Sequence, residues 1–253
     1  SANIDESETS VISSFKTATV MNRRVWIGNI KTVDTRGPSY DKVLGDAMIG
    51  SNVNSFHSFP SQKIIEASVR DGDEIVKLTS FEDKLLQYKR RKLHVFDMSD
   101  PEIITVESTE LHKGVNHESN VCDTEYGPAW VNQHGAYLYD GEKTIDLTQK
   151  EGIKLLKIVS TGNHDSWQEF TMSDTLNKNN LQFCQVGYNL PNKQLVITGF
   201  GEVDGVSVNT SVYIFDFTSS SWTKATNILT EGLRTNFVND KDGLLCWIVD
   251  PED

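Results

Sequence analysis

The residues best suited to metal chemistry lie close together in one polar segment. His112, His117 and Glu118 supply two imidazoles and a carboxylate, which are ligands that a divalent metal ion accepts. Polar loop residues of this kind also hydrogen-bond locally without a metal, and we adopt this second interpretation. The sequence therefore predicts no metal site, and His112 and His117 are kept as candidate interaction residues.

Three aspartates recur at equivalent places. Asp97, Asp140 and Asp216 each end a strand-like run of aromatic and β-branched residues. Pairs of carboxylates can hydrolyse glycosides, but a single active site does not need the same residue in every repeat. An aspartate at such a place accepts hydrogen bonds from the backbone N–H groups of a turn. We predict that the three aspartates are structural turn residues and that the chain has no catalytic residue.

The sequence lacks the motifs that mark common enzyme classes. It contains no Gly-x-Ser-x-Gly, no His-Glu-x-x-His and no P-loop. Its cysteines are Cys122, Cys184 and Cys246; an odd number without a close pair argues against zinc and favours free thiols. We expect no cofactor and no enzymatic activity.

Five tryptophans could stack on a sugar ring. Four of them lie in predicted strands at repeat-like positions, where core packing is the expected role: Trp26, Trp130, Trp222 and Trp247. Trp167 lies outside the predicted strands and is the candidate exposed contact residue. A carbohydrate-binding or carbohydrate-processing propeller therefore stays open as an alternative function.

Short strand signals dominate the chain and recur in groups. Runs rich in Val, Ile, Tyr, Phe, Trp and Thr are separated by turns of Gly, Asn, Asp or basic residues. Groups of four runs span residues 75–107, 120–147 and 181–225, and hairpin-like pairs at 17–28 and 235–249 look like incomplete groups. Repeats of about 40–50 residues match the blade period of propellers. The sequence predicts an all-β, β-propeller-like fold of repeated four-stranded antiparallel blades.

We predict a single propeller-like domain over residues 1–253, which is either complete or part of a longer chain. Residues 31–74 are polar and rich in Gly and Ser, which predicts a long loop with one strand. Residues 149–180 predict an insertion between blades. A short helix is expected near residues 163–180, because Asp165 and Ser166 are suited to a helix start.

The charge argues against several classes of partner. Lys plus Arg is 24 and Asp plus Glu is 36, which gives a net charge of −12. Nucleic-acid backbones and anionic membranes are bound by basic surfaces, so we expect no specific nucleic-acid binding and no membrane association. The only basic cluster, Lys89, Arg90, Arg91 and Lys92, predicts a solvated turn. The N-terminus is polar and acidic, so we expect no signal peptide.

The third group of strands resembles one kelch repeat. The resemblance lies in residues 195–201, residues 212–216 and Trp222, although the double glycine of that repeat is missing. It implies a kelch-like protein-interaction domain as an alternative function.

A broader part of the chain, roughly residues 75–225, resembles tail-associated structural proteins of tailed bacteriophages. The matching stretches are residues 81–95, 126–141 and 212–223, and the similar proteins are of the nozzle, muzzle and stabilisation types of podovirus and crAss-like phages. The resemblance implies a non-enzymatic tail component, made in the host cytoplasm and assembled in the virion. Its partners would be other tail proteins and copies of itself in a ring. An acidic surface would suit a channel that DNA passes without sticking.

Overall fold

The computed structural model describes most of the chain. The described residues are 10–34, 36–60, 63–68, 71–100, 103–150, 153–154, 167, 172–173, 182–198, 202–203, 206–207, 212–225 and 237–246. The chain divides into two compact units, Ser1–Glu118 and Ser119–Asp253, called unit 1 and unit 2 below. Each unit is described by itself.

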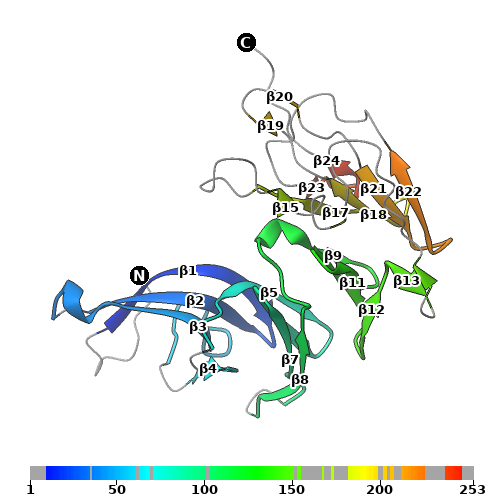
Figure 1. Ribbon diagram of the computed structural model, residues 1–253. Helices are drawn as coiled ribbons and strands as arrows, with labels where there is room; N and C mark the ends of the chain where they lie inside the picture. The colour runs from blue at the N-terminus through cyan, green and yellow to red at the C-terminus, as the bar shows by residue number, and fades with distance from the viewer. Residues whose placement is uncertain are drawn as a thin grey trace. The chain divides into compact units, whose positions relative to one another are not determined.

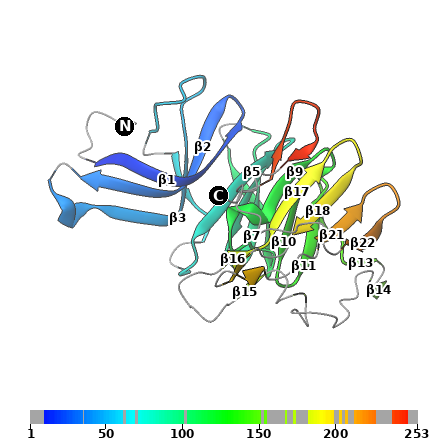
Figure 2. The ribbon, with the colours of Figure 1, turned by 90° about the horizontal axis from the view of Figure 1, so that it is seen from above.

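Unit 1 begins with a four-stranded antiparallel sheet in the order β1-β2-β3-β4. Its strands are β1 (Ser10–Met21), β2 (Arg24–Asp34), β3 (Lys42–Gly50) and β4 (Ile64–Glu66). Asn22 and Arg23 form the turn between β1 and β2, and their φ angles of 51° and 57° match the twist of a tight hairpin. The outer ends of β1, β2 and β3 project from the rest of the unit as a long ribbon (Figures 1 and 2).

This sheet corrects the expectation for residues 31–74, which was a long loop with one strand. β2 continues to Asp34, and β3 and β4 complete a four-stranded sheet. Glycines at positions 45 and 50 weaken the strand signal of β3. At Gly50, an added Cβ atom would lie 2.7 Å from the Trp26 ring. The glycine is therefore what lets the indole lie against the strand.

The second sheet of unit 1 is the first of the predicted groups. Its strands, in the order β5-β6-β7-β8, are β5 (Ile75–Phe81), β6 (Lys84–Lys89), β7 (Lys92–Asp97) and β8 (Thr105–Leu111). Strand alternation places the side chains of Leu85 and Phe96 on one face of this sheet, opposite each other on β6 and β7.

The first strands of the two sheets lie beside each other. The backbone N–H of Leu78 on β5 donates to Thr17 Oγ1 on β1 at 2.9 Å, and the Ser80 hydroxyl donates to the Val20 carbonyl at 3.2 Å. The buried residues that pack together here come from both sheets: Met21, Trp26, Met48, Ile75, Leu78, Leu85, Phe96 and Met98. Two four-stranded sheets packed in this way correspond to neighbouring propeller blades.

Unit 2 repeats the arrangement with two further sheets. The first has the order β12-β11-β10-β9, with β9 (Val121–Thr124), β10 (Gly127–Asn132), β11 (Gly135–Tyr139) and β12 (Thr144–Asp146). The second has the order β17-β18-β21-β22, with β17 (Gln185–Asn189), β18 (Gln194–Thr198), β21 (Val212–Asp216) and β22 (Ser221–Ala225). The hairpin of β19 (Glu202–Val203) and β20 (Val206–Ser207) lies between β18 and β21 in the chain.

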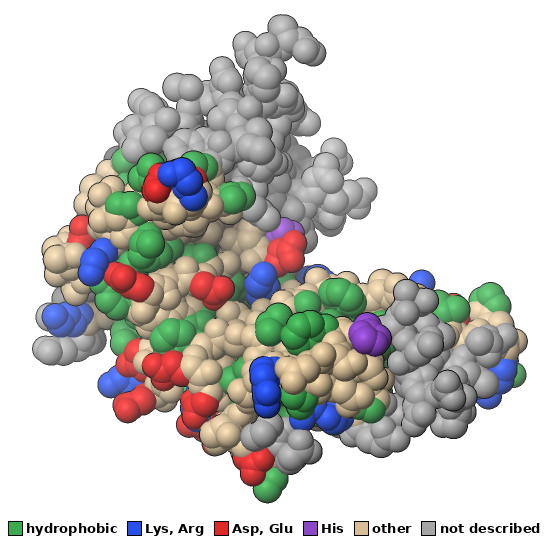
Figure 3. Space-filling model, turned by 180° about the vertical axis from the view of Figure 1, so that it is seen from behind, with side chains coloured by type: hydrophobic (Ala, Val, Ile, Leu, Met, Phe, Trp, Pro, Cys, Tyr) green, Lys and Arg blue, Asp and Glu red, His purple; other side chains and the backbone are tan. Residues whose placement is uncertain are grey.

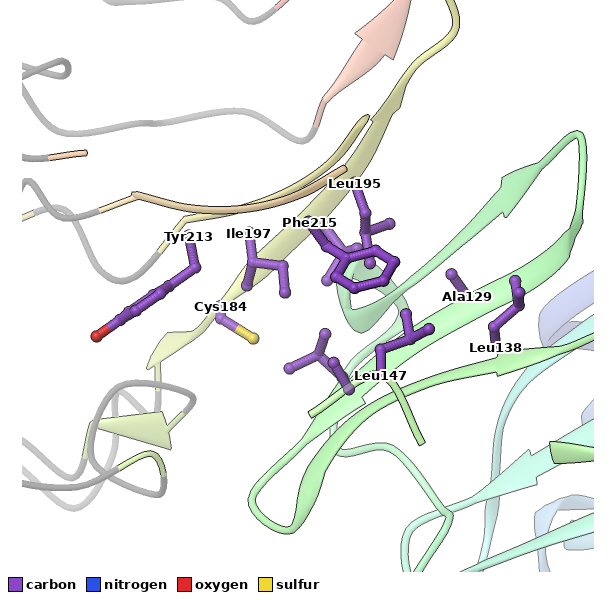
Figure 4. Packing of buried hydrophobic residues seen from close by; sticks show 11 residues of the cluster. Ala129, Leu138, Leu147, Cys184, Leu195, Ile197, Tyr213 and Phe215 are labelled. Atoms are coloured by element: carbon purple, nitrogen blue, oxygen red, sulfur yellow. The ribbon is translucent and has the colours of Figure 1, made fainter. Parts of the chain in front are cut away.

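The first strands of unit 2 also meet. Asn120 Nδ2, directly before β9, donates to the Cys184 carbonyl, directly before β17, at 2.7 Å. Side chains from both sheets then point toward one another and form the core (Figure 4). Its buried members include Ala129, Leu138, Leu147, Cys184, Leu195, Ile197, Tyr213 and Phe215. The fold is thus all-β and propeller-like, built from successive four-stranded antiparallel sheets, as the sequence predicts.

Three short hairpins complete the described structure. Their strands are β13 (Gln149–Lys150) with β14 (Ile153–Lys154), β15 (Met172–Ser173) with β16 (Gln182–Phe183), and β23 (Val238–Asn239) with β24 (Leu245–Cys246). Within the predicted insertion at 149–180, the described residues are these strand residues and Trp167. Within the helix expected near 163–180, Met172 and Ser173 instead form strand β15, so the expectation is wrong there; apart from Trp167, the other residues of that range lie outside the described residues.

Candidate interaction surface

Asp97, Asp140 and Asp216 each stand where a strand enters a turn. One carboxylate oxygen of each accepts hydrogen bonds from the backbone of the following residues. The donors are the N–H groups of Ser99 for the first, Glu142 and Lys143 for the second, and Thr218 and Ser219 for the third, at 2.8 to 3.0 Å. The Ser99 N–H lowers the pKa of Asp97, and the Ser219 N–H does the same for Asp216. These carboxylates are ionised turn acceptors.

Other aspartates have the same role, which the sequence analysis missed; Asp146 and Asp240 are two of them. The Thr148 N–H donates to Asp146 Oδ1 at 2.9 Å, and the Asp242 N–H donates to Asp240 Oδ1 at 2.8 Å. An aspartate two residues before a turn N–H is the signal that could have found them.

The histidines chosen from the sequence are exposed. His112 directly follows β8, with a φ angle of 64°, and its backbone N–H donates to the Arg91 carbonyl at 2.8 Å. His117 and Glu118 lie a few residues further on, also exposed. Across the described ranges, no three His, Cys, Asp or Glu residues come together in a way that could hold a metal ion.

Trp167 is half-buried, and its indole has partners within unit 2. Its Nε1 donates to the Asn132 carbonyl at 2.8 Å. Its ring meets those of Tyr213 and Trp222 edge-on, with centroids 5.9 and 6.2 Å apart. Trp167 therefore contributes to the edge of the unit 2 core, which leaves less of the ring available to a sugar.

The basic cluster at the β6–β7 turn corrects a further expectation. Arg90 and Arg91 are exposed, as predicted, but the Lys89 side chain has an exposed fraction of 0%. Lys89 Nζ lies 3.2 Å from Asp71 Oδ2, and Lys92 Nζ lies 2.8 Å from the same oxygen. A lysine at this depth needs such a partner, because an unpaired buried charge is costly.

The surroundings of Lys89 lower the pKa of two groups, its partner Asp71 and the nearby His94. Burial acts to raise the pKa of Asp71, but hydrogen bonds from Lys92, the Asp73 N–H and Lys89 lower it to about 2. His94 packs nearby on β7, and its ring nitrogens lie 3.0 Å from Ser68 Oγ and 2.8 Å from Thr109 Oγ1. Burial first, and then Lys89 and Lys92, lower the pKa of His94 to about 4. The imidazole is therefore neutral near pH 7 and has a structural role.

Exposed apolar side chains gather on the ribbon of β1, β2 and β3. Val33 on β2 has an exposed fraction of 41%, and Val43 on β3 one of 70%. Lys31 lies directly opposite Val43, so all three side chains share one face. Phe15 on β1, with an exposed fraction of 52%, lies opposite Ile30 and therefore on the other face of the ribbon. We call Lys31, Val33 and Val43 the ribbon surface.

A second exposed apolar group follows the other end of unit 1. β8 is the last strand of its sheet, so one of its edges has no neighbouring strand within that sheet. Val106 and Leu111 on β8 have exposed fractions of 44% and 66%, and Ile103 just before it reaches 65%. We call these three residues the β8 edge. Figure 3 shows hydrophobic, basic and acidic side chains on one face of the molecule.

Comparison with known proteins adds little to this geometry. No protein-family model matches the chain, and no curated protein matches it in sequence. Among solved structures, Hsv2 of Kluyveromyces lactis aligns with a TM-score of 0.30 and 10% identity, over 84% of this chain and 72% of that chain. A likeness this low carries no argument about function. In the described part of the chain, no helix has the length and apolar character to cross a membrane.

Proposed function

We propose that this chain is a non-enzymatic structural component of a bacteriophage tail, of the nozzle or muzzle type. The observation that carries the proposal is the distribution of apolar residues on unit 1. Phe15, Val33 and Val43 on the ribbon, and Val106 and Leu111 at β8, keep large apolar side chains in solvent at the outer parts of two sheets. Apolar groups exposed together mark surfaces that contact other proteins.

The residues that suggested chemistry have structural partners instead. The Asp97, Asp140 and Asp216 carboxylates accept hydrogen bonds from turn residues, and the buried Lys89 forms an ion pair with the partly exposed Asp71. These contacts agree with a scaffold whose polar groups stabilise the fold. The resemblance of residues 75–225 to phage tail proteins gives this scaffold its proposed setting.

The test is to look for the chain in virions. Particles purified from the host culture are digested and analysed by mass spectrometry, and particles labelled with antibodies against the chain are imaged by electron microscopy. We expect its peptides in stoichiometric amounts and label at the distal end of the tail. Absence of the chain from washed, intact virions would overturn the proposal.

The kelch-like and carbohydrate alternatives predict other outcomes. A single cellular protein recovered with the chain, with none of it in virions, would support an interaction domain of a cellular protein. Glycan binding that is lost in Trp167→Ala would support the sugar interpretation. The indole contacts with Tyr213 and Trp222 argue against it.

A further inference from the structure

We propose that unit 1 binds a water molecule in its interior, between its two sheets, through the side-chain amide of Gln87 and the ammonium of Lys89. Both residues lie on β6, and both are fully buried. Each has hydrogen-bonding capacity that the protein itself does not use. The inference is independent of the proposed function, because it concerns only the interior of unit 1.

Gln87 carries the buried amide of this site. Its side chain is 0% exposed, and neither Oε1 nor Nε2 has a hydrogen-bond partner in the protein. A primary amide offers an acceptor oxygen and two N–H donors. A buried polar group without a partner pays the full cost of its desolvation. Native proteins therefore pair such groups with protein atoms or with ordered water.

The strand register places Gln87 where the apolar and polar parts of the interior meet. Side chains alternate along β6, so Leu85, Gln87 and Lys89 share one face of the sheet. Leu85 belongs to the core that packs against the first sheet of unit 1, and so does Leu78, which lies opposite Gln87 on β5. The amide therefore lies between an apolar core and a buried ammonium.

The polar neighbour of Gln87 across the sheet already has its own partners. His94 lies opposite Gln87 on β7. Its Nε2 lies 3.0 Å from Ser68 Oγ, and its Nδ1 lies 2.8 Å from Thr109 Oγ1. Since both ring nitrogens are engaged with hydroxyl groups, the imidazole does not satisfy the amide.

Lys89 supplies a donor on the same face as Gln87. An ammonium group has three N–H donors. Within the described part of the chain, the acceptors of Lys89 Nζ are the two oxygens of one carboxylate, that of Asp71, at 3.3 and 3.2 Å. The ammonium is 0% exposed, so an N–H group directed away from Asp71 needs an acceptor in the interior.

A further buried donor comes from the opposite sheet. Trp26 on β2 is 1% exposed, and its Nε1 has no hydrogen-bond partner in the protein. Its side chain packs in the same core as Leu78 and Leu85. Both sheets therefore contribute polar atoms with unused bonding capacity to this part of the interior.

The chemistry of these groups selects water as the ligand. Gln87 Oε1 needs a donor, and Lys89 Nζ needs an acceptor. Water can be both at once, and buried waters typically make about three hydrogen bonds to polar groups that lack protein partners. An anion would accept from the ammonium but leave Oε1 unpaired, and a metal cation would be repelled by the ammonium.

The first experiment counts the long-lived waters of the full chain in solution, by magnetic relaxation dispersion of the water oxygen. Gln87→Met removes both polar atoms and keeps a side chain of similar length. We expect this variant to hold one long-lived water fewer than wild type. The matched control is Leu86→Met, which changes a fully buried neighbour on the other face of β6 and should keep the water. Equal numbers of long-lived waters in wild type and Gln87→Met would overturn the inference.

The second experiment compares the thermal unfolding midpoints of the same proteins. A bound water makes the amide a satisfied group, so Gln87→Met should have a lower midpoint than wild type. A dry, unpartnered amide predicts the opposite, because its replacement by an apolar side chain removes a desolvation cost. A higher midpoint for Gln87→Met would therefore contradict the proposal.

A crystal structure of wild type tests the site without any variant. We expect a water within about 3 Å of both Gln87 Oε1 and Lys89 Nζ. Protein atoms that fill this position, or an amide that turns to bond a protein group, would overturn the inference.

Discussion

The two units have the same pairing of four-stranded sheets but fill the space against these sheets differently. In unit 1, Leu85 and Phe96 on β6 and β7 belong to an apolar core. Further along the same two strands, the polar residues Lys89 and His94 are also buried. In unit 2, the core is continuous with a group of aromatic rings. The members of that group are Tyr126, Trp167, Tyr213, Phe215, Phe217 and Trp222.

The difference shows that the order of strands in a sheet does not determine which kinds of side chains are buried against it. Aromatic rings contribute large apolar areas and edge-on contacts that need no exact charge balance. A buried ion pair gives little net stability, yet it becomes strongly destabilising when one partner is lost. Unit 1 should therefore respond to charge and pH, and unit 2 to side-chain volume.

The largest effect is expected in unit 2, from Phe215→Ala. The Phe215 side chain is 4% exposed, and its ring lies 5.1 Å from that of Phe217 and 5.2 Å from that of Trp222. Loss of a buried phenyl group should lower the free energy of unfolding by about 4 kcal/mol. Hydrogen exchange of the full chain, followed by mass spectrometry, should show faster exchange in residues 185–198 and 212–225. Phe215→Leu is the control and should have a smaller effect.

A somewhat smaller effect is expected in unit 1, from Asp71→Ala. The change leaves the Lys89 ammonium buried without its carboxylate, and we expect a loss of about 3 kcal/mol. Exchange should rise in peptides of β5 to β8. Lys89→Met is the control, because it removes the buried charge and keeps an apolar side chain of similar length. Equal losses in the two variants would show that the ion pair is not the cause.

A pH dependence should belong to unit 1. The pKa of His94 falls from an ordinary 6.5 to about 4 in the folded protein. Below pH 6.5 the unfolded chain therefore binds the proton more readily, and stability is lost as the pH falls from 6.5 toward 4. Thermal unfolding midpoints of wild type and His94→Gln, measured across this range, should show a steeper fall for wild type. Parallel curves would contradict the assignment.

The smallest effect is expected from a feature that both units share, the aspartate at a turn. Asp140→Ala removes the acceptor of two backbone N–H groups, and we expect a loss of about 1 kcal/mol. Asp140→Asn keeps a side-chain oxygen and should lose less. Denaturant titration of the three proteins measures the difference, and equal stability of Asp140→Ala and wild type would refute this role.

Much of the fold could be predicted from the sequence, because local signals sufficed. Alternating apolar residues and turn-forming residues placed the strands of three sheets, including β5 to β8, close to their observed positions. In the first sheet, the sequence predicted the hairpin of β1 and β2 but not the rest of the sheet, because Gly45 and Gly50 weaken the strand signal of β3. The contact of Gly50 with the Trp26 ring joins residues far apart in sequence, so no local pattern could show it.

The candidate site was less predictable. The sequence predicts that Lys89 is part of a solvated basic turn. Its burial is explained only by Asp71, which approaches it from the segment before β5. Trp167 reads as exposed, but Tyr213 and Trp222 cover part of it. The exposed valines of the ribbon look like any other strand residues in the sequence, because strand alternation does not say which face is covered.

The sequence by itself determined the all-β class, the four-strand repeat and the turn aspartates, because these depend on the conformations of neighbouring residues. The tertiary structure alone decided which charges are buried in pairs and which apolar side chains remain in solvent. Both depend on the packing of distant segments, which sets the local dielectric environment of a charge and the accessible area of an apolar group. The ribbon surface and the β8 edge became visible only at that level.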